Sequence, residues 1–395
     1  MKIQLTKDKT IELNFPGGGG GSSKSITDLV GIELFSGHPN GCPALHLFRK
    51  KKAWHIDSLG FVKEPNGVLP ESWDEVTKQP TWEMPKDFQA PHAALAVNSA
   101  QASFGQASPE AIIQEMMHGP SQTTATVAAQ TDPGKKKFGL KHAAPAAPKP
   151  AASTESVRKP DFPEAGVPVS ENGRRFAVRP SAEEGFHLCA SLPEFQSLWV
   201  SRLLPEGKRP TTRSIQVNES ALMASILAQP EFIAAKGTML AIFVRDEAIY
   251  FAGYKDGMPV LWRRCPGVAG YLAMRKAVKK TLGIDEDLLN SVLEDSLIDP
   301  RPALVPFLQP ILEQLDLARA YLLSKHGINA EKAMLLGLPC GASHWQHYAE
   351  EALKLQLVAP HPFDGIELDK NIKVDHPHDY LVALGAALAA TEVEA

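Results

Sequence analysis

Apolar and polar positions follow a strand-like pattern in two sets of three short segments, one set in each half of the chain. The first set covers residues 29–35, 44–48 and 53–63, and the second covers residues 238–244, 248–252 and 259–263. Short charged or glycine-containing turns separate the segments, and Asp256-Gly257 is a typical hairpin signal. Each set therefore predicts a three-stranded antiparallel meander.

Helical periodicity follows the second meander. It predicts helices over residues 270–282, 286–298 and 303–326. Asp285 is suited to cap the second helix, and Gly283 and Gly327 are suited to end the first and the third.

Buried-type strands complete the pattern in each half. Residues 333–338 form one such strand, which leads through a glycine-bearing turn into a helix over residues 343–357. Residues 93–97 form the matching strand in the first half. Two copies of meander, helix and buried strand predict a duplicated α/β fold, with a central cleft between the copies as the default ligand site.

Two segments interrupt this pattern. Pro16 leads into five consecutive glycines, and residues 143–152, inside a low-complexity region over residues 120–173, include six alanines and three prolines. These segments hold much of the 32 Pro and 29 Gly of the 395-residue chain. Such sequences cannot bury enough apolar surface to offset their ordering entropy. They predict a flexible N-terminal arm and a partly disordered insertion.

Charge and cysteine content narrow the class of protein. With 41 basic and 45 acidic residues, the net charge is −4, and the chain has no excess of positive charge that would bind a nucleic-acid backbone. No nucleic-acid partner is therefore expected. The four cysteines, Cys42, Cys189, Cys265 and Cys340, are too widely spaced for a zinc finger and fit a reducing compartment. The longest apolar run, residues 380–390, is shorter than the roughly 20 residues that span a bilayer, so we expect a cytoplasmic protein.

Several stretches, in their order along the chain, resemble the actin-like ATPase superfamily. In detail they resemble the PilM-like proteins of type IV pilus machinery, which are related to the cell-division protein FtsA. The stretches are residues 30–36 (VGIELFS), 214–227, 265–267 (CPG) after the second meander, 335–341 (LLGLPCG), 361–363 (HPF) and 378–390. The resemblance implies duplicated ribonuclease H-like (actin-like) domains.

The resemblance also implies a nucleotide site. In such folds two glycine-bearing hairpins present backbone N–H groups to phosphates, and an acidic residue holds Mg²⁺ through water. Carried over to this chain, the cofactor-binding residues are Glu33, Ser36, Gly37, Gly337 and Gly341, and Glu33 is the metal residue. The implied cofactor is ATP with Mg²⁺.

The chain departs from this chemistry at each loop. Phe35 occupies the place of the first glycine, Phe243 that of the second acidic residue, Arg245 that of its glycine, and Leu338 that of a glycine in the third stretch. We therefore expect no ATP hydrolysis, and either weak nucleotide binding or no cofactor.

Structural roles for the nominated residues stay open beside the functional ones. Gly337 and Gly341 also suit a tight strand-to-helix turn, and Glu33 also suits a strand residue with a local partner. Glycines are plentiful in the interrupting segments and scarce in the loops where a phosphate would need them.

Two other sets of residues resemble known sites, one a P-loop and the other a metal site. Residues 18–25 (GGGGSSKS) nearly match a P-loop, but the segment after them has a strand pattern where a P-loop requires a helix, which favours a linker. The pairs His344/His347 and His376/His378 have no acidic or cysteine partner at ligand spacing, so they are interpreted as surface histidines. The sequence predicts no catalytic residue.

The N-terminal arm is a candidate partner-binding segment. PilM-like proteins are expected to bind the extended cytoplasmic tail of a membrane protein, PilN. Ile11, Leu13, Phe15 and Pro16 have a similar apolar-then-proline character in a short extended segment. The arm is then either a segment that docks in that groove in cis or in a neighbouring subunit, or an ordinary extension.

These predictions divide the chain into six parts. They are a flexible arm (1–25), the first part of the first actin-like domain (26–118), the insertion (119–173), the completion of an inserted subdomain and the first domain (174–232), the second domain (233–375) and a helix returning to the first domain (376–395).

The expected function is that of a scaffold on the cytoplasmic side of a type IV pilus or type II secretion-like inner-membrane platform. It would be held at the membrane by a PilN-like tail, with a pilus motor ATPase and further copies of itself as candidate partners. The alternatives are an active ATP-hydrolysing PilM-like protein, an FtsA-like division protein and, less well supported, a sugar-kinase-like enzyme.

Overall fold

The computed structural model describes most of the two predicted halves. The described residues are 2–6, 9–12, 27–36, 38, 40–50, 53–63, 86–88, 90–97, 103–107, 174–180, 187–193, 210–245, 248–265, 270–285, 288–289, 301–337, 347, 350–374 and 376–391. The predicted insertion (119–173), the P-loop-like residues 18–25 and most of the predicted helix over residues 286–298 lie outside them.

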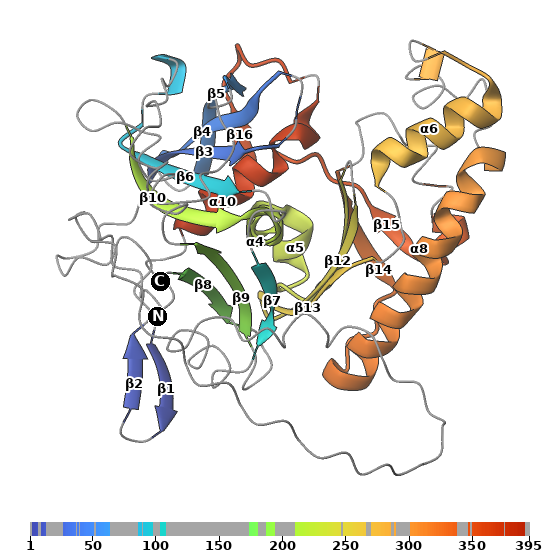
Figure 1. The fold of residues 1–395 in the computed structure, drawn as a ribbon, viewed down its shortest axis with the longest axis horizontal. Helices are drawn as coiled ribbons and strands as arrows, with labels where there is room; N and C mark the ends of the chain where they lie inside the picture. The colour runs from blue at the N-terminus through green and yellow to red at the C-terminus, as the bar shows by residue number, and fades with distance from the viewer. Residues whose placement is uncertain are drawn as a thin grey trace, which may run out of the picture.

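The first large sheet is built on the first predicted meander. Its strands are β3 (Asp28–Leu34), β4 (Cys42–Lys50) and β5 (Ala53–Val62), which pair antiparallel. On the other side of β3, β6 (His92–Val97) and β10 (Thr211–Val217) add in parallel, and β16 (Ile366–Leu368) pairs with β5. The order is β10-β6-β3-β4-β5-β16 (Figure 1).

The second large sheet repeats this arrangement. The meander strands are β11 (Met239–Val244), β12 (Ile249–Lys255) and β13 (Met258–Arg264), and β14 (Lys332–Leu336) and β15 (Gln356–Val358) add in parallel beside β11. The order β13-β12-β11-β14-β15 has the same pairing pattern as β5-β4-β3-β6-β10. The predicted duplication is confirmed.

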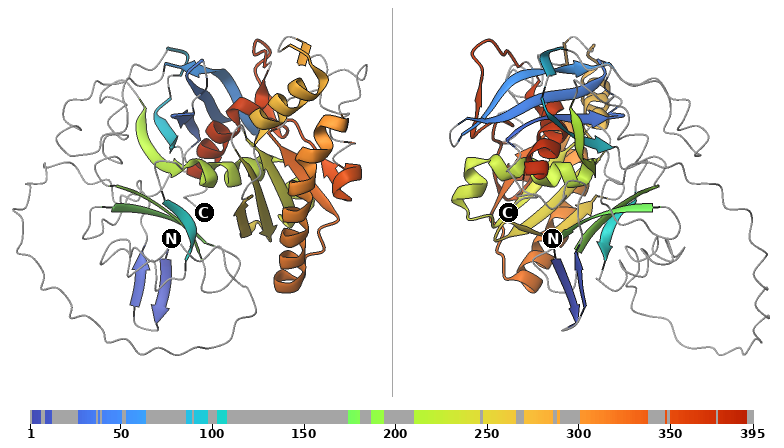
Figure 2. Two further views of the ribbon diagram at one scale, coloured as in Figure 1. Left: turned by 45° about the vertical axis from the view of Figure 1, so that its right-hand side comes forward. Right: turned by 90° about the vertical axis from the view of Figure 1, so that its left-hand side faces the viewer.

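Helices separate and cover the two sheets. The helices α4 (Asn218–Ser225) and α10 (Leu381–Thr391) lie between the large sheets (Figure 1). The helices α6 (Tyr271–Leu282) and α8 (Arg301–Tyr321) lie on the outer side of the second sheet (Figures 1 and 2). Short helical segments are η1 (Lys86–Phe88), η4 (Ile226–Ala228), α5 (Pro230–Ala234), η5 (Leu322–His326) and η6 (Pro377–Tyr380).

One hydrophobic core joins both large sheets. It contains Leu45 and Leu47 of β4, Phe243 of β11, Tyr254 of β12 and nearly the whole of α10. Because α10 is apolar on all sides, it is buried on all sides, with Leu381, Val382 and Leu384 inaccessible to solvent. A second core lies between the second sheet and α6 and α8, and a third covers the opposite face of the first sheet.

Two smaller sheets complete the described structure. The strands β7 (Ser103–Ala107), β8 (Arg174–Pro180) and β9 (His187–Pro193) pair antiparallel in the order β7-β9-β8, so they bring together residues on either side of the predicted insertion. In the expected arm, β1 (Lys2–Thr6) and β2 (Lys9–Glu12) form a hairpin.

Two helix predictions need correction. The helix predicted over residues 343–357 is too long, because Lys354 adopts a left-handed conformation (φ 49°) and residues 356–358 form β15 beside β14. The helix predicted over residues 303–326 is present, but its last turn, η5, is a π-helix that ends at the left-handed Gly327. Among the helices that the structure describes, none has the length and hydropathy needed to span a membrane.

Candidate functional site

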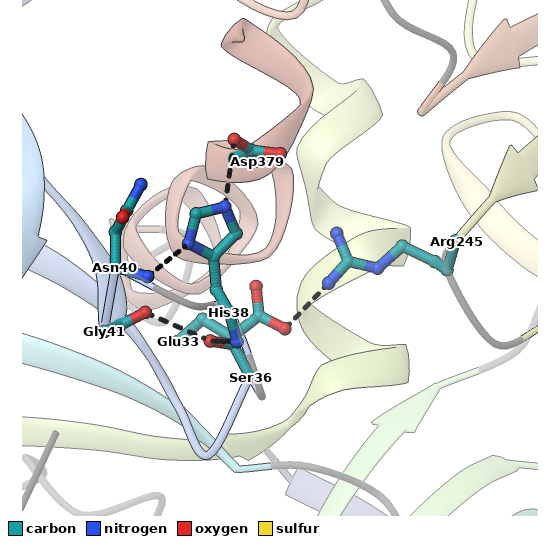
Figure 3. Close-up of polar contacts among 7 residues, drawn as sticks. All are labelled: Glu33, Ser36, His38, Asn40, Gly41, Arg245 and Asp379. Carbon is teal, nitrogen blue, oxygen red and sulfur yellow. Dashed lines mark hydrogen bonds and ion pairs between the residues drawn. The ribbon is translucent and has the colours of Figure 1, made fainter. Parts of the chain in front are cut away.

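Glu33 and Arg245 meet between the two large sheets (Figure 3). The Arg245 Nη2 donates to the Glu33 Oε1 over 2.8 Å, and the Asn218 Nδ2 donates to the same oxygen over 3.0 Å. The Glu33 side chain is 2% exposed, whereas the Arg245 side chain is 25% exposed. Both residues lie in the loops that the resemblance assigns to phosphate binding. The cation beside the Glu33 carboxylate is the guanidinium of Arg245, in the place where the resemblance implies a metal ion.

The strands determine which way these two residues face. Ile32 and Leu34, the neighbours of Glu33 in β3, belong to the core on the opposite face of the first sheet, so Glu33 points toward the second sheet. Arg245 follows β11 directly. Its N–H donates to the Ala248 carbonyl over 2.9 Å, and its carbonyl accepts the Tyr271 N–H over 2.8 Å. The hairpin and the start of α6 therefore fix its backbone.

Phe35 keeps the backbone conformation of a glycine in the first loop. Its φ of 57° lies in the left-handed region, which costs a residue with a Cβ about 1–2 kcal/mol. The phenyl group packs against the core on the outer face of the first sheet. Phe35 therefore has a turn conformation that favours glycine, with its side chain on the face of the sheet opposite Glu33.

Ser36 uses its hydroxyl within its own loop. Its Oγ donates to the Gly41 carbonyl over 3.3 Å and accepts the His38 N–H over 3.1 Å. Gly37 lies outside the described residues.

His38 ties the same loop to η6. Its Nδ1 accepts the Asn40 N–H over 3.2 Å, and its Nε2 lies 3.4 Å from the Asp379 Oδ2 (Figure 3). Its ring stacks on Phe61 with the centroids 4.3 Å apart. The loop after β3 is therefore held by η6 on one side and by β5 on the other.

Gly337 has a structural reason to be glycine. Its φ is 94°, and a Cβ at this position would lie 2.0 Å from the Val244 carbonyl oxygen. Its N–H donates to the His378 Nδ1 over 3.1 Å. The end of β14 thus packs directly against the end of β11. Leu338, Cys340 and Gly341 lie outside the described residues.

His378 accepts this bond as a neutral imidazole. Burial, together with the nearby His361, lowers the pKa of His378 to about 3. The interpretation of His378 as a surface histidine needs a correction, because the residue is half-buried and its Nδ1 accepts a backbone N–H from Gly337.

The other members of the histidine pairs form no metal site in the described part of the chain. His376 is exposed, His344 lies outside the described residues, and the exposed His347 has its Nδ1 3.9 Å from a Glu350 oxygen. Among the described residues, no group of three or more His, Cys, Asp or Glu side chains is arranged to hold a metal ion.

Of the arm residues nominated for partner binding, the structure describes Ile11. It lies in β2, where its backbone pairs with Ile3 of β1. Leu13, Phe15 and Pro16 lie outside the described residues.

Sequence reasoning missed Asn218 and His378 as members of the site. Asn218 directly follows β10, which runs parallel to β6 and β3, so it lies at the same carboxyl edge as Glu33. A polar residue at the end of a buried parallel strand was the available signal. For His378 the sequence contains no comparable signal, because its partner is a backbone N–H 41 residues away.

The described residues do not fit a Mg²⁺–nucleotide complex held in the way that the resemblance implies. A guanidinium already lies 2.8 Å from the carboxylate that would face the metal. The space beside Gly337 is filled by the Val244 carbonyl. We therefore derive no chemical step from a bound nucleotide.

Comparisons with known proteins agree with the architecture. No protein-family model and no curated protein sequence matches the chain. Among solved structures, the PilM–PilN type IV pilus biogenesis complex matches with a TM-score of 0.53 at 13% identity, covering 92% of this chain and 98% of that chain.

Two further structures are similar at lower scores. A Bacteroides thetaiotaomicron protein with an actin-like ATPase fold has a TM-score of 0.39 at 7% identity, covering 86% of this chain and 95% of that chain. The cytoplasmic domain of EpsL, an inner-membrane component of the Vibrio cholerae type II secretion system, has a TM-score of 0.34 at 7% identity, covering 92% of this chain and 95% of that chain. Together with the duplicated sheets and the helices between them, the match to the PilM–PilN complex shows that this chain has the actin-like ATPase fold.

Proposed function

We propose that this chain is an assembly protein of a type IV pilus or type II secretion-like inner-membrane platform, and that it binds the cytoplasmic tail of a PilN-like membrane protein. The observation that carries the proposal is the match to the PilM–PilN complex, which extends over 92% of this chain. In this role the chain works on the cytoplasmic side of the membrane and reaches it through its partner.

The candidate nucleotide site supports a binding role over an enzymatic one. Glu33 is engaged by Arg245 and Asn218, and the Ser36 hydroxyl is used within its own loop. Among the described residues that contact Glu33 and Arg245, none is placed as a general base or nucleophile. We therefore propose that the work of the protein is partner binding, without ATP hydrolysis.

Peptide titration tests the proposal. Fluorescently labelled peptides with the sequences of the cytoplasmic tails of membrane proteins encoded nearby are titrated with the full chain, and fluorescence anisotropy is measured. We expect one tail to bind saturably and a scrambled version of it to bind at least about 10-fold more weakly. If the protein is folded by circular dichroism and no tail binds better than its scrambled version, the proposal is wrong.

The arm has a separate test. If residues 1–21 occupy the tail-binding groove in cis, deleting them removes a competitor, and the affinity for the tail peptide increases. Unchanged affinity would contradict docking in cis while leaving tail binding itself intact.

A further inference from the structure

An ion pair between a buried carboxylate and a half-buried guanidinium lies where the family resemblance implies a metal and a nucleotide. Glu33 belongs to the first large sheet and Arg245 follows a central strand of the second, 212 residues later. Their side chains meet at 2.8 Å in the space between the two sheets (Figure 3). The pair therefore joins the two duplicated halves directly.

The two partners do not depend on each other equally. The Glu33 side chain is 2% exposed, so its charge has lost nearly all contact with water and needs a nearby cation. The Arg245 side chain is 25% exposed and keeps part of its hydration. Asn218 adds a neutral hydrogen bond to the same carboxylate oxygen, but it cannot supply charge. Loss of Arg245 is therefore expected to destabilise the folded state more than loss of the Glu33 charge.

We infer that this ion pair takes the place of a metal-bound nucleotide as the link between the two sheets, so that the two halves are joined here without any ligand. A divalent cation at Glu33 would have to displace the guanidinium and remain close to its positive charge. The Gly337 N–H, which follows β14 of the second sheet, donates to His378 of η6 over 3.1 Å and adds a second contact that needs no ligand. The inference goes beyond the proposed function, because it does not require a partner tail.

A double-mutant cycle tests whether the pair forms this link. Urea unfolding is measured for the full chain, Glu33→Gln, Arg245→Met and the double variant. We expect Arg245→Met to raise the unfolding equilibrium constant about 100-fold or more, because it removes the guanidinium that lies 2.8 Å from a carboxylate with 2% exposure. Glu33→Gln should raise it about 10-fold, and the double variant should be more stable than Arg245→Met alone.

The matched control is Arg264→Met, which removes an exposed positive charge from the end of β13 in the same sheet. It should change the unfolding constant by no more than about 2-fold. Arg245→Met alone could fail to accumulate as folded protein. The inference then still expects Glu33→Gln and the double variant to fold, and a double variant that also fails to fold would contradict it. Additive effects of the two substitutions would overturn the inference.

Addition of nucleotide provides a second, independent test of the inference. Millimolar Mg²⁺–ATP should leave the thermal unfolding midpoint of the natural chain unchanged, because the link already exists without it. A rise of several degrees that Glu33→Gln abolishes would mean that Glu33 serves a metal-bound nucleotide, and the inference would then be wrong. This result is independent of peptide binding, so failure of the inference and failure of the proposed function are distinguishable.

Discussion

The half-buried His378 and the buried Cys265 show how the surroundings of a group set its chemistry. His378 stays neutral because burial and His361 both oppose its protonation, and this leaves its Nδ1 lone pair available to Gly337. Cys265 stays a thiol because burial raises its pKa to about 12, although Arg263 acts in the opposite direction. Both groups are held in their uncharged forms by desolvation.

His378 should make the protein less stable in mild acid. Its pKa is about 3 in the folded chain and 6.5 in the unfolded chain, so between these values the unfolded state binds a proton that the native state does not. As the pH decreases below 6.5, the free energy of unfolding should fall by up to about 1.4 kcal/mol per pH unit from this group.

The matched variant for this prediction is His378→Asn, whose amide oxygen can accept the Gly337 N–H but does not titrate. Urea unfolding at pH 7.5 and 5.5 should show a smaller loss of stability in this variant than in the natural chain. The His38–Asp379 pair is present in both proteins, so its contribution cancels in the comparison. Equal losses would contradict the assignment.

Cys265 should resist alkylation in the native protein. It is 2% exposed, and its raised pKa leaves very little of the reactive thiolate at pH 8. Mass spectrometry after iodoacetamide treatment should find this cysteine unmodified in native buffer and modified in concentrated urea. Rapid modification without urea would show that the core around it opens readily.

At the level of elements, α10 connects parts of the molecule that are distant in sequence. It lies against β3 at Gly31, where a Cβ would be 2.0 Å from the Ala383 carbonyl oxygen. It lies against α4 at Gly385, where a Cβ would be 1.7 Å from the Ala221 carbonyl oxygen. These two glycines allow backbones to touch on both sides of the helix, and the Gln216 side chain adds a hydrogen bond to the Ala386 carbonyl over 3.2 Å.

Gly31→Ala should therefore separate α10 from the first sheet. Because the clash is with backbone rather than with a side chain that can rotate, we expect the free energy of unfolding to fall by about 3 kcal/mol. Gly60→Ala in β5 is the control, since its new Cβ would meet only the Phe88 ring at 3.6 Å. Urea unfolding should place the control within about 0.5 kcal/mol of the natural chain, and a similar loss in both variants would contradict the close-packing argument.

At the scale of the whole molecule, the two duplicated halves share one core. Residues from β3, β4 and β5 of the first sheet and from β11, β12 and β14 of the second belong to the same hydrophobic core as α4 and α10. The Tyr254 hydroxyl of the second sheet also donates to the Met223 carbonyl in α4 over 2.9 Å. The halves are therefore expected to fold as one cooperative unit.

This expectation can be tested with one tryptophan from each sheet. Trp54 of β5 and Trp262 of β13 pack against the shared core from opposite sides. After 5-fluorotryptophan incorporation, their ¹⁹F signals, assigned by single Trp→Phe replacements, should disappear at the same urea concentration. Two clearly separate midpoints would show that the halves unfold independently.

The elements that the sequence predicts well are those fixed by nearby residues. The meander strands follow from alternation and from local turns such as Asp256-Gly257, where both residues have positive φ values (50° and 80°). The end of α6 follows from Gly283, which is left-handed as expected of a C-terminal cap. Local patterns also indicated that the two halves are copies.

The elements that were missed depend on distant partners. Residues 356–358 continue an apolar pattern that suits a helix, and only pairing with β14 makes them a strand. The strand β7 pairs with β9 across more than 80 residues, which no local pattern reveals. At the site, Glu33 was nominated from its motif, but its pairing with Arg245 and Asn218 depends on how two sheets and a helix are placed in space.

The position of α10 in the sequence has a consequence for how the protein is made. The helix that fills the space between the two sheets consists of residues 381–391, which leave the ribosome after every other described element. Until then, the inner face of the first sheet has no helix to cover it at Gly31, and the shared core cannot close. We therefore expect the native state to form only after residues 381–391 have been synthesised, and nascent chains that lack them to expose apolar surface that chaperones recognise.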